Sequence, residues 1–416
     1  MRRYLFSLLA FSTLYSDVEL SGHVDLDSQF YLKYPDKKNK NSFTAKQTLE
    51  LKYIYTDLTL FCSLYMQQAY HDFREESEKT DRTFVRLNEF YAKYDFENSA
   101  FKIGKSIEFW GSLELRNITD GFNPIDLRND MFAKDKLGVY NAAYTYYFEN
   151  SELSLITKLR EEQQLMARKS YAYYFFPDFV TYDKTLKSQK SINRPSLYLK
   201  YSGSTDTKYP MDYAFIYENG YDSQRYFAPE NFQNFQQKKP TNFQENVYIV
   251  NKFMTYDTLV VGNTLLKLEA LYAKVDKNPI VGDYSHIGVG VEHTIENFYE
   301  NNALGLITEY YRYNTYESKK ASDRLLFETM QNDLFIGGRY SLNNADDSSF
   351  IGGGIFDLEY DEQTYYLKFE SRFVETFKLS CDYYYIIPSN KQLEPLTAYQ
   401  ILGKHQRLGI NIAYYF

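Results

Sequence analysis

The chain ends with the nine residues Leu408-Gly-Ile-Asn-Ile-Ala-Tyr-Tyr-Phe416. Large apolar residues occupy every second position, and small or polar residues lie between them. Because successive side chains of a strand point to opposite faces, this segment has one apolar face and one polar face. An alternating strand that ends the polypeptide on Phe is typical of the last strand of an outer-membrane β-barrel.

Composition supports a barrel for the whole chain. The 416 residues include 44 Tyr and 32 Phe but only 1 Trp, and the mean hydropathy is -0.54. A transmembrane barrel combines aromatic girdles outside with a polar interior, so it is polar on average and still rich in aromatic residues. The net charge of -8 argues against general nucleic-acid binding.

Alternating segments recur along the chain and predict an all-β fold. We expect one transmembrane, antiparallel, up-and-down β-barrel of about 18 strands, with 16 as the alternative, over residues 17–416. Long and short connections alternate in order, as in barrels that have short turns at one end and long loops at the other. A connection at Tyr360–Gln363 is shorter than this alternation predicts.

The first 16 residues have the pattern of a signal peptide. Met1-Arg2-Arg3 is basic, and Tyr4–Leu14 is apolar. No later run approaches the roughly 18 apolar residues of a membrane helix. We therefore expect export to the bacterial outer membrane and contact with its lipid. We also expect the terminal strand to be recognised, through Phe416, by the barrel-assembly machinery.

Strand parity places charged residues on the interior face. They carry both signs, which favours pairing across neighbouring strands as the simplest interpretation. A barrel of about 18 strands is too wide for side chains alone to fill, so it leaves an aqueous lumen unless a loop enters it. The predicted lumen-lining residues are Glu89, Lys93, Lys267, Glu269, Arg339, Lys368, Glu370, Arg372 and Arg407.

The connection of residues 105–138 differs from an ordinary exposed loop. It contains Trp110, the only Trp of the chain, together with Phe122, Ile125 and Leu127. These apolar side chains need a buried place, and the barrel interior is the one available. The segment is therefore predicted to fold inward.

Parts of this connection resemble a known group of proteins. Gly104-Lys105, Trp110-Gly111, Asn123–Arg128 and the later Gln331–Asp347 are similar to segments of proteobacterial outer-membrane barrels of largely unknown function. These barrels are distant relatives of substrate-selective porins such as the alginate exporter. The resemblance implies that the inward loop narrows a pore. The implied constriction residues are Lys105, Glu108, Trp110, Glu114, Arg116, Asp120, Asp126 and Arg128. A plug that only stiffens the barrel is the alternative for this loop.

Signs of catalysis are weak. His71-Asp72 has no nucleophile context, and neither a metal-ligand spacing nor a phosphate-binding loop occurs, so we expect no enzyme, metal or cofactor. Cys62 and Cys381 fall on apolar strand faces, where they are interpreted as small apolar side chains. The tyrosine-rich segment Ser170–Pro177 is predicted to pack against the barrel rim rather than to stack on a solute.

The sequence thus favours a porin-like channel for passive diffusion of small hydrophilic solutes, narrowed by the loop 105–138. Two alternatives stay open. One is a non-conducting surface barrel, either an adhesin or a structural protein. The other is an uptake channel for apolar small molecules, which predicts an apolar tunnel instead of a charged lumen. The strand pattern fits a monomer and a trimer equally.

Overall fold

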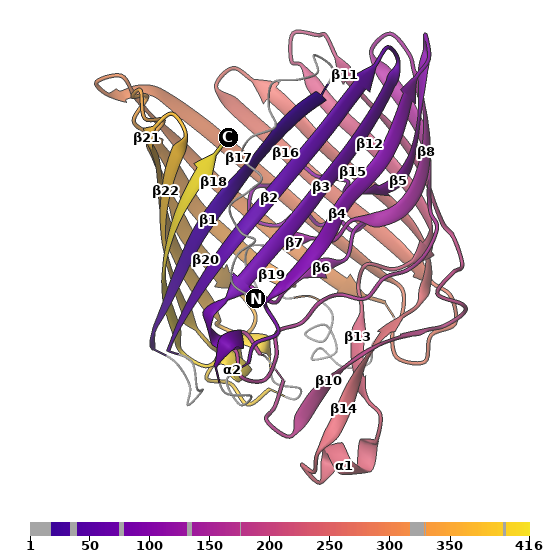
Figure 1. Cartoon of the computed structure of the whole chain (residues 1–416), viewed down its shortest axis with the longest axis vertical. Helices are drawn as coiled ribbons and strands as arrows, with labels where there is room; N and C mark the ends of the chain where they lie inside the picture. The colour runs from indigo at the N-terminus through magenta and orange to yellow at the C-terminus, as the bar shows by residue number, and fades with distance from the viewer. Residues whose placement is uncertain are drawn as a thin grey trace.

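The computed structural model describes residues 18–33, 40–74, 79–130, 135–174, 176–316, 328, 330–393 and 397–416, except for the side chains of residues 183, 184 and 398. The predicted signal peptide, residues 1–16, lies outside these residues. The described chain forms an 18-stranded antiparallel sheet that closes on itself, which confirms the predicted fold class and strand number (Figure 1).

Each barrel strand pairs with its neighbours in chain order, and β23 pairs with β1. The first nine strands are β1 (Val18–Lys33), β2 (Asn41–Tyr55), β3 (Leu58–Ala69), β4 (Phe84–Asp95), β5 (Ser99–Ser106), β8 (Val139–Tyr147), β9 (Ser151–Lys158), β11 (Ser196–Thr205) and β12 (Met211–Tyr221). The other nine are β15 (Ile249–Val261), β16 (Thr264–Val275), β17 (Tyr284–Tyr299), β18 (Asn302–Thr315), β19 (Asn332–Ser341), β20 (Ser349–Asp357), β21 (Gln363–Val374), β22 (Phe377–Ile387) and β23 (His405–Tyr415).

The terminal segment closes the barrel seam. The N–H of Gly22 donates to the carbonyl of Phe416 at 3.0 Å, and the N–H of Phe416 donates to the carbonyl of Gly22 at 3.1 Å. A Cβ atom on Gly22 would lie 2.3 Å from the carbonyl oxygen of Thr48 and 3.0 Å from the Phe416 ring. Glycine is therefore needed for the close approach of the strands at the seam.

Short and long connections separate to the two ends of the barrel, as their alternation predicts (Figure 1). At the short-turn end, Thr56 and Gly262 adopt positive φ values of 49° and 59° in tight hairpins. The exception at the long-loop end is the short connection 358–362 between β20 and β21.

The long connections contain small elements that strand patterns did not predict. They are the 3₁₀-helix η1 (Tyr70–Phe73), α1 (Phe232–Gln236), α2 (Ala398–Leu402), the pair β6 (Ile125–Asp126) and β7 (Asp135–Lys136), and a three-stranded sheet of β10 (Val180–Ser188), β13 (Tyr226–Pro229) and β14 (Thr241–Val247). Among the described residues, no helix is long and apolar enough to span a membrane.

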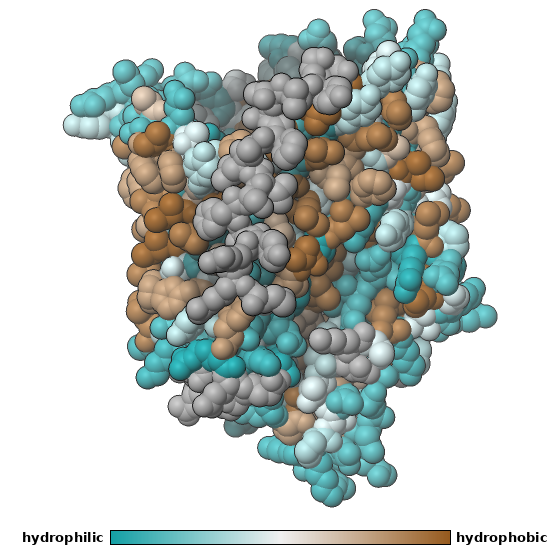
Figure 2. All heavy atoms as spheres, viewed as in Figure 1, coloured by the Kyte–Doolittle hydropathy of each residue, from teal (hydrophilic) through white to brown (hydrophobic). Residues whose placement is uncertain are grey.

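The two faces of the barrel wall differ in character. Outward side chains are large and apolar, such as Phe215, Phe253 and Ile287, which are 55%, 60% and 41% exposed. Figure 2 shows such residues gathered across the middle of one face, with hydrophilic residues at both ends. Inward side chains include buried charges such as Lys252 and Glu269. This inside-out distribution matches the apolar-out, polar-in alternation of a barrel in a bilayer.

Candidate functional site in the barrel lumen

The loop of residues 107–138 crosses the barrel interior. It leaves β5 and returns to β8, which is the next strand of the wall. Yet its residues 112–119 contact β16, β17 and β18. From β5, the strands in order are β8, β9, β11, β12, β15, β16, β17 and β18, so β18 is the eighth neighbour in a ring of 18. The loop therefore reaches almost the opposite wall, and its inward fold is confirmed.

Glu269 of β16 forms the first seat for this loop. Its carboxylate accepts hydrogen bonds from the backbone N–H of Ser112 at 2.7 Å and of Leu113 at 3.0 Å. Thr119 donates to it from both its backbone N–H and its hydroxyl, each at 3.1 Å. Glu269 has no exposed surface. A buried carboxylate needs such donors, so loop and wall depend on each other.

Glu309 of β18 forms the second seat. Its two oxygens accept from the backbone N–H of Glu114 at 2.7 Å and of Leu115 at 3.0 Å. The adjacent Tyr311 donates its hydroxyl to Glu309 at 2.7 Å and accepts from the N–H of Arg116 at 3.1 Å. Consecutive loop amides are thus held by side chains of one wall strand.

Glycines make room for the loop between these seats. A Cβ atom on Gly288 or Gly290 of β17 would lie 2.5 Å or 2.9 Å from the methyl groups of Leu113. The loop residue Gly111 has a φ of 134°, and a Cβ atom there would lie 2.5 Å from the amide oxygen of Asn117. Side chains at these positions would move the loop from the wall.

Trp110 anchors the near side of the loop. Its ring centroid lies 5.3 Å from that of Phe122 and 5.6 Å from that of Tyr198 on β11. These rings belong to an apolar cluster with inward residues such as Val139 and Met254. Trp110 is only 3% exposed, so it fills the space between loop and wall and does not line an opening.

The returning part of the loop binds the other side of the barrel. Asp126 forms ion pairs with Arg86 of β4 at 2.7 Å and with Arg128 at 2.8 Å. Burial by itself raises the pKa of Asp126, but hydrogen bonds and charges from Arg128 and Arg86 outweigh burial and hold that pKa below its usual range. Further along, Asp130 pairs with Arg407 of β23. The loop is therefore fixed at both walls.

The tyrosine-rich segment also packs inside the wall. The hydroxyl of Tyr31 on β1 donates to that of Tyr171 at 2.9 Å, and the guanidinium of Arg82 lies 4.1 Å from the Tyr171 ring centroid. Tyr173 is also buried. It is 1% exposed and packs against His405 of β23. Burial raises the pKa of Tyr173. These side chains help to hold the inward loop against β1 and β23.

Charges of opposite sign meet where the loop passes the wall. Lys267 lies 3.0 Å from Glu114 of the loop and 2.9 Å from Glu292 of β17. Arg339 of β19 lies 3.2 Å from Glu114 and 3.9 Å from Glu292. The side chains of Glu114 and Arg339 remain 32% and 40% exposed. Glu114 and Arg339 are therefore charged, partly exposed residues at the boundary between the loop and the wall.

The other residues implied to form a constriction lie in different settings. Glu108 pairs with Lys102, and Arg116 lies 3.2 Å from Glu328. Asp120 pairs with Lys136 at 2.5 Å, in a largely buried position. Asp126 and Arg128 form the buried clamp already described, so among these residues Glu108, Glu114 and Arg116 are the more exposed charges.

Lys105 departs from the prediction, because it belongs to β5 and lies on the outer face. It is paired with Phe90 and Tyr140, which are outward and 57% and 49% exposed. Its ammonium donates to the carbonyl of Leu87 at 3.0 Å. A lysine on an apolar face bends its long side chain toward a polar group, so Lys105 can stay on the outer face although the resemblance implied a place in the constriction.

The predicted lumen-lining residues all have inward parity. Glu89 accepts from the N–H of Ile107 at 2.8 Å, and Lys93 lies 2.7 Å from Asp95. Glu370 lies 2.8 Å from Lys368 and 3.0 Å from Lys378. Lys267, Glu269, Arg339 and Arg407 make the contacts given above, and Arg372 lies at the short-turn end. Pairing of opposite charges is the common pattern.

Sequence reasoning missed Glu292, Glu309 and Tyr311. All three are buried residues with inward parity on β17 or β18, so the parity rule that selected Glu269 also applies to them. The roles of Glu309 and Tyr311 had no signal, because their partners in the loop are backbone amides. Glu292 instead contacts two predicted lumen residues, Lys267 and Arg339.

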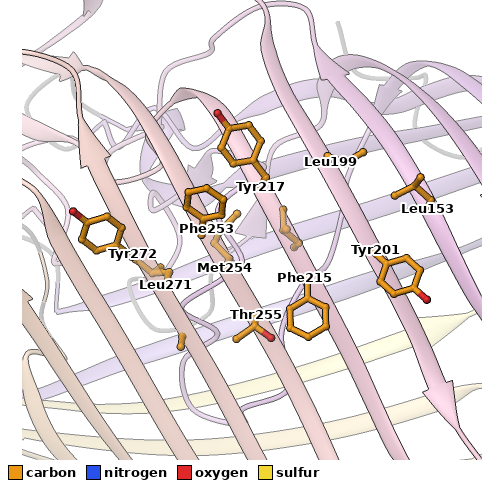
Figure 3. A pocket seen from close by; sticks show the side chains of 12 residues that line it. Leu153, Leu199, Tyr201, Phe215, Tyr217, Phe253, Met254, Thr255, Leu271 and Tyr272 are labelled. Carbon is orange, nitrogen blue, oxygen red and sulfur yellow. The ribbon is translucent and has the colours of Figure 1, made fainter.

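An apolar hollow of about 540 Å³ lies on the outer wall. Register places Phe215, Thr255 and Ala270 side by side on β12, β15 and β16. Across these strands, the two smaller side chains Thr255 and Ala270 lie beside the large Phe215 and leave the hollow. Figure 3 shows aromatic side chains of neighbouring strands around Thr255. The hollow belongs to the apolar outer surface, on the other side of the wall from the charged lumen.

In the weak catalytic motif His71-Asp72, the aspartate binds backbone amides of its own connection. Asp72 accepts from the N–H of Thr80 at 2.5 Å and from the N–H of Arg82 at 2.7 Å. The described residues contain no group of three or more His, Cys, Asp or Glu side chains arranged to hold a metal ion. Cys62 and Cys381 are free thiols on β3 and β22.

No protein-family model and no curated protein matches the sequence. Solved structures do match the fold. The outer-membrane protein OpdK from Pseudomonas aeruginosa matches with a TM-score of 0.55 at 9% identity, over 96% of this chain and 99% of that one. Its structure with vanillate matches with a TM-score of 0.56 at 9% identity, over 96% and 98% of the chains.

A second protein with a similar structure is Wzi, a carbohydrate-binding β-barrel involved in group 1 capsule assembly in Escherichia coli. It matches with a TM-score of 0.51 at 9% identity, over 95% of this chain and 84% of that one. At such low identity the likeness concerns the fold alone. The resemblance to relatives of the alginate exporter stays a prediction. The chain therefore shares the closed β-barrel fold of these bacterial outer-membrane proteins.

Proposed function

We propose that this protein is an outer-membrane channel through which small hydrophilic solutes diffuse passively. The observation that carries the proposal is the loop 107–138, which crosses a wide lumen and binds the far wall through Glu269 and Glu309. The charged boundary at Glu114 and Arg339 remains exposed beside it. A wide barrel with a fixed inward loop is suited to limiting the size and charge of solutes.

The narrowest part of the proposed path lies at the loop–wall boundary. Glu114 and Arg339 are its main charges, with Glu108 and Arg116 as further exposed residues of the same loop. Because these charges are paired, the boundary is close to neutral and favours neutral or weakly charged solutes. OpdK has been solved with vanillate, which supports passage of small molecules by analogy of fold only.

The apolar outer band supports placement in outer-membrane lipid. We also propose that residues 1–16 are removed on export and that residues 17–416 form the mature barrel. The strand ending at Phe416 would be the segment that the barrel-assembly machinery recognises, because it forms the closing seam with β1.

Planar-bilayer recording tests this function. Refolded protein should give discrete conductance steps, and a variant lacking residues 114–128 should give larger steps. The different gel mobility of folded and heated barrels would show that both proteins are folded. Absence of steps from folded protein, or identical steps from the two proteins, would contradict the channel.

A non-conducting surface barrel is the second candidate. Burial of Tyr171 and Tyr173 against the wall favours it, because packed loops at one end obstruct a path. The three-stranded sheet at that end gives a ready binding surface, and Wzi is a carbohydrate-binding barrel of similar fold. Binding that depends on these loops, without conductance, would favour this candidate. The charged inner wall argues against uptake of apolar molecules.

A further inference from the structure

A polar cavity of about 250 Å³ lies between the short-turn ends of β19, β20, β21 and β22. Inward side chains of adjacent strands form its wall, since register places Ser341, Ser349 and Glu370 side by side. The cavity is lined by Arg339, Ser341, Asn343, Asp347, Ser348, Ser349, Glu370, Ser371, Arg372 and Lys378. It lies inside the lumen, near the mouth opposite the long loops.

Positive charge exceeds negative charge around this cavity. Glu370 is shared by two ammonium groups, because Lys368 lies 2.8 Å and Lys378 lies 3.0 Å from the same oxygen. Arg372 is exposed, and within the described residues no carboxylate lies within 4.0 Å of its guanidinium. The lining holds the cations Arg339, Arg372 and Lys378 and the carboxylates Glu370 and Asp347. Because Arg339 contacts Glu114 and Glu292, Arg372 carries the positive charge that the described carboxylates leave uncompensated.

Hydroxyl groups complete the donor set on a turn that is already ordered. The hydroxyls of Ser348 and Ser371 are 2.8 Å apart. Asn344 accepts from the N–H of Ser348 at 2.9 Å, and the N–H of Arg372 donates to the carbonyl of Asp346 at 2.7 Å. The backbone beside Arg372 is therefore held in place before any ligand arrives.

We propose that this cavity binds a small oxyanion, namely the carboxylate or phosphate group of a solute in the lumen. The guanidinium of Arg372 supplies a planar fork that matches two oxygens of such a group. Lys378 adds charge, and the serine hydroxyls add donors. A cation is not favoured, because one of the two lining carboxylates already binds two ammonium groups.

The inference rests on the proposed function only in that the solute reaches the cavity through the lumen. Arg339 belongs both to the cavity lining and to the contact with Glu114 of the inward loop. The cavity thus lies beside the narrow boundary and would hold an anionic solute at one end of it. This narrows the solute class from hydrophilic molecules in general to those that carry an oxyanion.

Calorimetric titration of the full-length, detergent-solubilised protein with inorganic phosphate tests the site without requiring conductance. Arg372→Gln should weaken phosphate binding at least about tenfold, because it removes one charge-assisted contact. Lys208→Gln is the matched control, since Lys208 is an exposed cation in the short connection between β11 and β12. It should bind phosphate like the wild type.

Bilayer recording with phosphate separates the two proposals. Block of conductance by phosphate that is relieved in Arg372→Gln supports both. Conductance without phosphate binding overturns the oxyanion site and leaves the channel standing. Phosphate binding in the calorimeter without conductance overturns the channel and supports the site. Equal phosphate binding by wild type and Arg372→Gln overturns the oxyanion site.

Discussion

Glu269→Gln is the substitution that most directly loosens the inward loop. The carboxylate accepts four hydrogen bonds from the loop, at 2.7, 3.0, 3.1 and 3.1 Å. Glutamine keeps one acceptor oxygen and presents an NH₂ group to the other donors, so two bonds lose their acceptor. Buried hydrogen bonds to a charged group contribute about 1.5–3 kcal/mol each, which gives a loss of about 3–6 kcal/mol. The equilibrium ratio of seated to released loop should fall by about a hundredfold or more.

Single-channel recording in a planar bilayer measures this effect. Glu269→Gln should increase the mean conductance and add slow fluctuations, because the loop leaves the far wall for part of the time. Glu292→Gln is the matched control. It removes the same charge on the neighbouring strand β17, where the carboxylate contacts Lys267 and Arg339 instead of amides of the described part of the loop.

The reasoning would be refuted by two results. One is a wild-type conductance and noise level in Glu269→Gln. The other is an equal increase in Glu292→Gln, because the effect would then follow from the lost charge and not from the lost seat. A wild-type step size in Glu292→Gln, with only a change in ion preference, agrees with the structure.

Three further predictions test other parts of the site. Glu114→Gln should shift the reversal potential in a KCl gradient while Lys105→Gln leaves it unchanged, and equal shifts would contradict the outward placement of Lys105. Gly111→Ala should destabilise the seated loop by about 1–3 kcal/mol because of its φ of 134° and the contact with Asn117; unchanged proteolysis of the loop would contradict this. The pKa of Asp126 is lowered, so its stabilising contribution is present above the ordinary carboxyl pKa of about 3.9 and is lost as pH falls through the lower folded value. Loop proteolysis should therefore stay constant from neutral pH to about pH 4 and rise below it. Asp126→Asn should show the faster proteolysis already at neutral pH. Release of the loop near pH 6 in the wild type would contradict the ion-pair clamp.

The wall of the barrel was predictable because strand parity is a local property. The terminal segment ending at Phe416 shows one apolar and one polar face, and the same rule places Glu269 and Arg407 inside. The burial of Trp110 could also be predicted, because a large apolar side chain is unfavourable on an exposed loop.

The contacts of the loop could not be predicted from strand parity or from the burial of apolar side chains. The donors at Ser112 and Leu113 are backbone amides, which every residue has, so no sequence signal marks their pairing with Glu269. The prediction for Lys105 was wrong for a different reason. The resemblance implied a constriction in the connection that was expected to begin at Lys105, although Lys105 continues the outward parity of Phe101 and Ile103. The sheet of β10, β13 and β14 was assigned to loops, because β13 has only 4 residues and β10 shifts register against β14 between Tyr182 and Leu186.

A disulfide between the loop and the far wall tests the central arrangement most directly. The Cβ position of Gly288 lies 2.5 Å from a methyl group of Leu113. Because Leu113→Cys removes that methyl group, cysteines at these two positions can approach each other without displacing the loop. The protein would carry Leu113→Cys and Gly288→Cys in a background where Cys62 and Cys381 are replaced by serine. The account predicts near-complete disulfide formation in the membrane-inserted protein under mild oxidation. Reduced thiols in folded barrels would contradict a loop that crosses the lumen.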